Sequence, residues 1–237
     1  MQKTIIALLS LVILSSCGEK KQEKDLLITG NIKGLKKGTI YIQKLQDTTL
    51  VALDTIKING DSHFTSELDI SSPEMYYLFL DRGVTNSLDN NIPFFAEKGK
   101  INIETSLDFF TADSKITGSK THEVYEEYKK IATRLVDQDL TLLEKKLNAY
   151  KNGKSEEIVT INKEQENLLK RKYLFTTNFA VNHKDSEVAP YLALAEIYDI
   201  NLKYLDTIQK SLTPKVAKSL YGKKLDELIK ERRKTEK

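Results

Sequence analysis

The chain has 237 residues and a mass of 27.1 kDa, which allows one large domain or two small ones. Hydrophobic residues make up 40% and charged residues 30%, so the chain can form a packed core, and this composition argues against wholesale disorder. The formal net charge of +3 is too balanced for a dedicated nucleic-acid binder. A single cysteine excludes an internal disulfide, a CxxC redox pair and a cysteine-rich zinc site.

The first sixteen residues are typical of a secretory signal peptide. Lys3 precedes an apolar run over residues 4–14, and small residues follow that run. Eleven residues rise about 16 Å as a helix, roughly half the thickness of the hydrocarbon layer, so this run is too short to cross a membrane. We therefore expect residues 1–16 to direct the chain to export.

The end of this segment, Leu14-Ser15-Ser16-Cys17-Gly18, resembles the lipobox of bacterial lipoproteins. The resemblance implies that the Cys17 sulfur carries a diacylglyceryl group, that the signal peptide is cut before Cys17, and that the new amine is acylated by a chain such as palmitate. Two or more acyl chains anchor a protein stably where one does not. The alternative is an ordinary signal peptide that contains a thiol.

Residues 17–25 are polar and of mixed charge, so we interpret them as a lipidated tether. Position 18 is glycine and not the aspartate associated with inner-membrane retention in some bacteria. We therefore expect a lipid anchor in the outer membrane of the cell envelope, on the periplasmic face. Display on the outer surface is the alternative.

Short segments of two-residue periodicity fill residues 26–118, which we predict to form a β domain. β-branched and aromatic residues alternate between glycines, and Asn59-Gly60-Asp61 favours a hairpin turn. The predicted strand segments are 27–32, 38–42, 54–58, 63–65, 76–80, 94–96 and 101–104. Six to eight short antiparallel strands indicate a β-sandwich or a curled sheet.

The periodicity becomes helical in residues 119–237, which predicts a helical domain and an α+β fold for the whole chain. Asn152-Gly153 divides two long helices, with Ser155 as the expected cap of the second, and we expect the two helices to pair antiparallel. Later helices are predicted to start at Asp185 and at Thr213-Pro214. The apolar faces of the two long helices are predicted to contain Val124, Tyr128, Ile131, Leu135, Leu143, Leu147 and Tyr150, and then Ile161, Leu168 and Phe175.

Several segments together resemble a β domain of unknown function that opens many Bacteroidetes-type lipoproteins of the thioredoxin-like, thiol-disulfide oxidoreductase class. The segments from the strand half are Leu27–Gly34, Gly38–Ile42, Asp54–Ile56, Asn59–Phe64, Phe95–Gly99 and Ile116–Ser119. In the helical half, Phe179, Asn182–Ser186, Leu212–Pro214 and Ser219–Gly222 resemble the segment that joins this domain to the thioredoxin fold.

This chain departs from that family in its chemistry. In the family, a thioredoxin domain with its CxxC motif follows about where this chain ends, whereas the only cysteine here is Cys17. Thiol exchange needs an attacking thiolate and a resolving partner, so the catalytic residues of the family have no counterpart in this chain. We therefore expect no enzymatic activity and no cofactor.

Among the remaining candidates, Tyr76, Tyr77 and Phe79 could form an aromatic face that binds a glycan or a peptide, although core packing is the simpler interpretation. His63, His122 and His183 form no metal motif and are interpreted as surface or turn residues, so we predict no metal site. The leading functional hypothesis is a membrane-anchored binding or scaffold module with a protein partner and no nucleic acid. The alternatives are an accessory or regulatory partner of a separate thioredoxin-like oxidoreductase, and a glycan or peptide binder.

Overall fold

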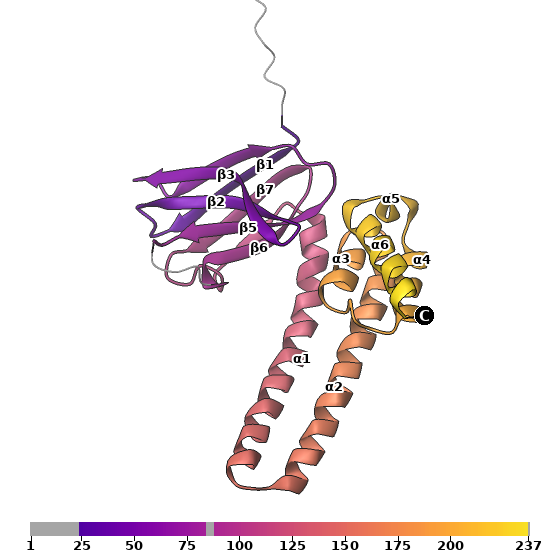
Figure 1. Cartoon of the computed structure of the whole chain (residues 1–237). Coiled ribbons are helices and arrows are strands. Elements are labelled where there is room, and N and C mark those ends of the chain that lie inside the picture. The colour runs from indigo at the N-terminus through magenta and orange to yellow at the C-terminus, as the bar shows by residue number, and fades with distance from the viewer. Residues whose placement is uncertain (1–23, 84–87, 237) are drawn as a thin grey trace, which may run out of the picture.

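A computed structural model describes residues 24–83 and 88–236, and it shows an α+β fold, as predicted. Two β-sheets form a sandwich, and all helices longer than one turn follow the last strand. Figure 1 shows the sandwich on one side, a cluster of helices on the other, and two long helices that project away from both. Across the described residues, none of the helices combines the length and apolarity needed to cross a bilayer.

Each sheet has four strands. The first sheet has the order β4-β1-β7-β8 and the second has the order β3-β2-β5-β6. A short 3-10 turn, η2 (Leu88–Asn90), precedes β6. The strand bounds are β1 (Leu26–Lys33), β2 (Lys37–Gln46), β3 (Thr49–Asn59), β4 (His63–Leu68), β5 (Glu74–Asp81), β6 (Asn91–Ala96), β7 (Gly99–Ser106) and β8 (Lys115–Thr117).

The sequence had suggested that all strands are antiparallel, and this prediction was wrong for one pair. β1 and β7 pair in parallel, with Ile28 opposite Ile101, while the other strand pairs are antiparallel. The parallel pair arises because the chain crosses from β6 in the second sheet to β7 in the first, and therefore enters β7 in the direction of β1. Such a crossover has no local sequence signal, unlike a hairpin turn.

The sandwich core follows from alternation along the strands. Leu78 and Leu80 of β5, with Ile92 and Phe94 of β6, point between the sheets and are almost fully buried. Gly30 of β1 is needed there, because a Cβ at this position would lie 2.2 Å from the backbone oxygen of Ile103 and against the ring of Phe64.

Two long antiparallel helices and a cluster of shorter ones make up the rest of the chain. Their bounds are α1 (Lys120–Lys151), α2 (Ser155–Asn182), α3 (Val188–Ala195), α4 (Leu202–Ser211), α5 (Pro214–Ala217) and α6 (Leu220–Thr235). α1 spans about 48 Å. Ser155 is not the cap of α2. Lys154 takes that position and makes no side-chain capping bond, because Gly153, at φ +66°, turns the chain directly into the second helix.

The body of the molecule contains a junction cluster, in which the outer face of the second sheet packs on the helices. Met75 and Phe95 from the sheet meet Tyr128 of α1, Leu192 of α3 and Tyr221 of α6. The Phe95 ring is fully buried and makes edge contacts with Tyr125, Tyr191 and Tyr221. These aromatic contacts connect the strand half to the helical half.

Candidate binding surfaces

The three aromatic residues of β5 that were proposed as one binding face do not share a face. Tyr76 is only 2% exposed and points into the sandwich core, where its ring meets Phe94 edge-on. Tyr77 and Phe79 point to the opposite side of the sheet, because successive residues of a strand alternate between its faces. Phe79 packs against Tyr41 of β2 with ring centroids 5.9 Å apart. Tyr76 therefore does not belong to a binding face.

Tyr77 lines an aromatic pocket of about 220 Å³ between the second sheet and the helices. Its walls come from β2, β5, α3 and α6. They comprise Leu45, Glu74, Met75, Tyr77, Tyr191, Leu194, Ala195, Tyr221 and Lys224. Three tyrosine rings and one carboxylate thus converge from segments far apart in the sequence, although Tyr77 alone among these rings was a candidate from sequence.

The polar groups of the aromatic pocket are held in place. The hydroxyl oxygen of Tyr221 accepts a hydrogen bond of 2.9 Å from the backbone N–H of Met75. Glu74 lies 3.6 Å from the ammonium of Lys44, yet burial raises the pKa of Glu74 above its usual range. Burial also raises the pKa of Tyr77 and Tyr191, so these hydroxyls remain protonated at neutral pH and can donate hydrogen bonds.

The start of α1 is fastened to the edge of the second sheet. Ser119 caps the helix by accepting from the N–H of His122, and the carboxylate of Glu97 accepts from the hydroxyl of Thr121 at 2.7 Å. The Nδ1 of His122 accepts from the N–H of Phe95 on the edge strand β6, at 3.4 Å. Its Nε2 lies 3.2 Å from Glu126. This direction of hydrogen bonding requires the Nε2–H form of the ring.

The histidines are separate from one another. His122 had been predicted to be a surface or turn residue, but it is buried. Its ring packs against the edge strand β6, where it accepts a hydrogen bond from a backbone N–H. His63 pairs with Asp61 at 2.7 Å in a turn, and His183 stacks on Phe179 at the end of α2. The described part of the chain holds no group of three His, Cys, Asp or Glu side chains placed to bind a metal ion. Cys17, the predicted lipidation site, lies outside the described residues.

A second candidate surface lies on the projecting part of α1 and α2, residues 133–170, which we call the arm. Figure 1 shows that the arm extends beyond both the sandwich and the other helices. Along α1, five apolar side chains recur at spacings of four and three residues and are 43–59% exposed. They are Val136, Leu140, Leu143, Leu147 and Tyr150. This spacing is that of a coiled-coil seam, and no element of the described chain covers it.

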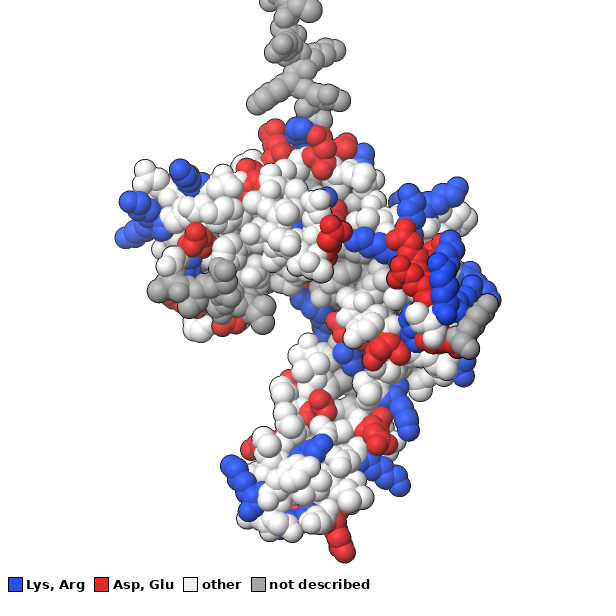
Figure 2. All heavy atoms as spheres, in the orientation of Figure 1, with Lys and Arg blue, Asp and Glu red and all other residues white. Residues whose placement is uncertain are grey.

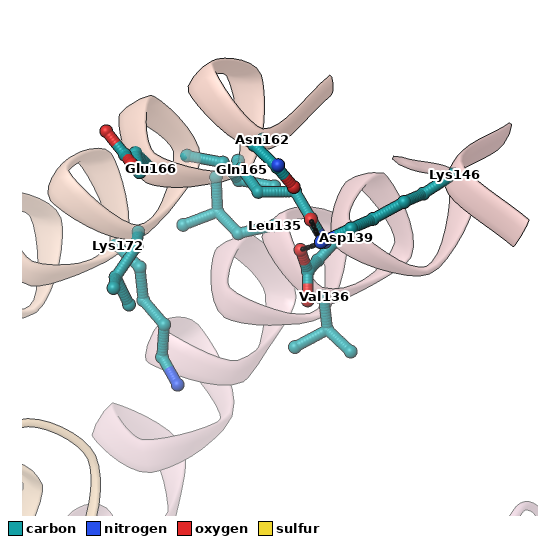
Figure 3. A pocket seen from close by; sticks show the side chains of 10 residues that line it. Leu135, Val136, Asp139, Lys146, Asn162, Gln165, Glu166 and Lys172 are labelled. Carbon is teal, nitrogen blue, oxygen red and sulfur yellow. Dashed lines mark hydrogen bonds between the residues drawn. The ribbon is translucent and has the colours of Figure 1, made fainter. Parts of the chain in front are cut away.

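The exposed seam lies beside the seam that joins the two helices. Leu135 of α1 and Leu168 of α2 are buried between the helices, and the next residue of each helix, Val136 and Leu169, lines a groove of about 580 Å³. Figure 3 shows the residues that line this groove, with Gln165 of α2 reaching toward Asp139 and Lys146 of α1. The amide nitrogen of Gln165 donates to Asp139 at 3.1 Å, and its oxygen accepts from Lys146 at 3.1 Å.

The opposite side of the arm is polar. The smaller groove on that side, of about 410 Å³, has Leu142 and Leu168 at its base and six polar side chains around them, which are Gln138, Thr141, Lys145, Glu164, Asn167 and Arg171. We call the side with the exposed seam the apolar face of the arm. In Figure 2 the arm shows uncharged surface between scattered charged side chains. Sequence periodicity had placed Leu143, Leu147 and Tyr150 on an apolar helix face, but spacing alone does not show whether a second layer covers such a face.

Comparison with known proteins gives a match for the strand half. No curated protein matches the chain. Residues 26–125 match the family model described as a domain of unknown function (DUF4369). The matched segment covers less than half of the 237 residues. It contains every strand that the structure describes, together with the capped first turns of α1. Residues 26–125 are therefore similar to this domain of unknown function.

Proposed function

We propose that the protein is a non-catalytic binding or scaffold module of the cell envelope, anchored through acyl chains on Cys17, and that it holds a protein partner on the apolar face of its arm. The observation that carries the proposal is the exposed seam on α1, from Val136 to Tyr150. Five large apolar side chains in one stripe form the type of patch that marks a protein interaction site.

The position of the arm supports a binding role. The hydrophobic core of the shorter helices includes residues from the end of α2 but none from residues 133–170. The arm therefore contributes neither to this core nor to the sandwich core. A rigidly held helix with an exposed apolar stripe is suited to bind another amphipathic helix. The cap formed by Ser119, Glu97 and His122 supplies that support, because it fixes the direction in which α1 leaves the sheet.

The anchoring part of the proposal rests on sequence. Cys17 occupies the cysteine position of a lipobox-like segment, and residues 18–25 provide a polar spacer. The start of the described chain is attached to the sandwich, because Lys24 pairs with Asp69 and Lys98 pairs with Asp25. An anchor at Cys17 would thus act on the sandwich and leave the arm free.

The non-catalytic part also rests on sequence, since a lipidated Cys17 has no thiolate with which to exchange electrons. An accessory role beside a separate thioredoxin-like oxidoreductase is one form of the same function, in which that enzyme is the partner. A dithiol-reduction assay on the purified protein addresses this part. Turnover above that of a Cys17→Ser variant would contradict it.

Photo-cross-linking in cells tests the docking role. A photoreactive residue at Leu143, on the apolar face, is expected to give a protein adduct of discrete mass on irradiation. The same residue at Lys145, which lies on the polar face of the same helix, is the matched control and is expected to give none. Absence of an adduct at Leu143, or equal adducts at both positions, would overturn the proposal.

A second candidate function is binding of a sugar ring or an aromatic peptide side chain in the aromatic pocket. The specific observation is the convergence of Tyr77, Tyr191 and Tyr221 with Glu74 around 220 Å³. Titration calorimetry with envelope polysaccharides tests it. Tyr77→Ala is expected to abolish the heat of binding, while Phe79→Ala, on the same sheet face outside the pocket, is expected to retain it.

A further inference from the structure

We propose that a second copy of this chain covers the apolar face of the arm, so that two arms form a four-helix bundle with both tips at the same end. In this arrangement α1 of each copy packs on α2 of the other. The inference rests on the proposed function, because it names the partner that docks on the arm. Four antiparallel-paired helices around a shared core are a stable solution for two such hairpins.

Helical geometry places the required residues on one side of the arm. Each residue advances by 100° around a helix, so the residue after a buried seam position turns toward the side of the hairpin. In an antiparallel pair, this step turns both helices toward the same side. Val136 after Leu135 and Leu169 after Leu168 follow this rule and line the same groove. The groove is also lined by Asn162 and Glu166 of the second helix, while Val159, which is 69% exposed, lies farther around α2 toward its outer edge.

The residue that follows Val136 on α1, and the residue that follows Leu169 on α2, each lie a further 100° around the helix, at the outer edge of the apolar face. Charged residues recur at this edge at intervals of seven. Along α1 these residues have the charge order minus, minus, plus, and along α2 the order minus, plus, plus. They are Asp137, Glu144 and Lys151 on α1, and Glu156, Lys163 and Lys170 on α2. All six are exposed, and none forms an ion pair within the described residues.

The register of the hairpin shows which charges would meet. Asp139 and Lys146 both reach Gln165, so Gln165 is level with the turn of α1 between them. In the same register Glu144 is level with Lys163, Asp137 with Lys170, and Lys151 with Glu156. Within one copy these edges lie on opposite sides of the arm. When α1 of one copy lies over α2 of the second, every one of the three pairs joins opposite charges, and the symmetry repeats all three.

The reverse arrangement, with α1 on α1 and the tips at opposite ends, gives a poorer match. Centred on the same turns, it would still place Asp137 near Lys151 and Glu156 near Lys170, but it would bring Glu144 near Glu144 of the second copy and Lys163 near Lys163 of the second copy. The same-end arrangement also leaves both copies with the start of the sandwich at one end, so both Cys17 anchors would reach a single membrane. Charge and anchoring therefore favour the same dimer.

The interface is small, and its centre is partly polar. About fifteen residues of two adjacent helices give a face about 22 Å long and about 20 Å wide, so two faces in contact bury on the order of 1,000 Å². Gln165, with Asp139 and Lys146, would lie in the bundle with its hydrogen bonds retained, as polar residues that fix register in helical bundles do. We therefore expect a reversible, concentration-dependent dimer.

Cysteine cross-linking on the full chain carrying Cys17→Ser tests the arrangement. A mixture of Glu144→Cys chains and Lys163→Cys chains is expected to form disulfide dimers under mild oxidation, and neither variant alone is expected to do so. Lys145→Cys mixed with Lys163→Cys is the matched control on the polar face. Dimers from Glu144→Cys alone, or from the control at the same rate, would overturn the proposed arrangement.

Sedimentation equilibrium tests the dimer itself. Leu143→Asp is expected to make the chain monomeric, and circular dichroism should show unchanged helix content because Leu143 is exposed. Glu144→Lys is expected to weaken the dimer about tenfold, and adding Lys163→Glu to the same chain is expected to restore it. A wild type that stays monomeric at high concentration would overturn the second copy as partner. A photoadduct of another mass at Leu143 would still support the proposed function.

Discussion

The junction cluster should decide whether the strand half and the helical half unfold together. Phe95 is fully buried and is in edge contact with three tyrosines of α1, α3 and α6. Truncating such a ring costs about 3–5 kcal/mol through lost transfer free energy and the cavity left behind. Each aromatic edge contact contributes about 0.5–1.5 kcal/mol. We therefore expect Phe95→Ala to lower the free energy of unfolding by about 4 kcal/mol and to uncouple the two halves.

Phe94 is the matched control, because it is the neighbouring residue, is equally buried, and points into the sandwich core instead. Hydrogen exchange followed by mass spectrometry at increasing urea concentrations measures each segment separately. Strand and helix peptides of the wild type should open at the same free energy. In Phe95→Ala the peptides of α3 and α6 should open first, and in Phe94→Ala the strand peptides should open first. Identical patterns in both variants would refute the coupling role of Phe95.

Four further substitutions have defined expectations. Tyr221→Phe leaves the buried N–H of Met75 without an acceptor, so thermal unfolding should show a loss of about 1–3 kcal/mol. Gly118→Ala forces a Cβ to within 2.1 Å of a backbone oxygen at φ +92° and should prevent stable folding, whereas Gly153→Ala, at φ +66° with open space, should cost about 1 kcal/mol in urea titration. A hydrogen bond from His122 lowers the pKa of Glu126 from its usual value of 4.5 to about 2. The ionised Glu126 side chain therefore contributes fully to the free energy of unfolding above pH 4.5, and this contribution is lost as the pH falls toward 2. After discounting for solvent exposure, Glu126→Gln should remove about 1 kcal/mol of this acid-sensitive stability, and a stability curve unchanged between pH 6 and pH 3 in both proteins would contradict it.

Local patterns predicted the α+β class and most elements, because local physics fixes them. The Asn59-Gly60 turn joins β3 and β4, and Gly153 ends the first long helix where the sequence places a break. The parallel pairing of β1 with β7 had no such signal, since it depends on the route of the chain between the two sheets. α4 also escaped prediction, although Asn201 caps it by accepting from the N–H of Lys203.

The candidate surfaces could be predicted only in part, for the same reason. Alternation along β5 places Tyr76 and Tyr77 on opposite faces, but only the packing of α3 and α6 on the sheet turns Tyr77 into a pocket residue. The spacing of Leu143, Leu147 and Tyr150 predicts an apolar helix face, but whether that face is covered depends on the tertiary structure. His122 likewise owes its burial to the edge strand it contacts and not to its helical position.

The proposed anchor and the arm act at opposite ends of the molecule. Asp25 lies eight residue steps after Cys17, so the tether reaches at most about 28 Å even when fully extended. Figure 1 shows the chain entering the sandwich on the side away from the arm tip, and α1 alone spans about 48 Å. On the proposed anchoring, the sandwich therefore lies next to the bilayer and the arm points away from it. A partner on the apolar face is then held tens of ångströms from the lipid, which explains why a lipid-tethered module would carry its docking surface on a long, firmly capped hairpin.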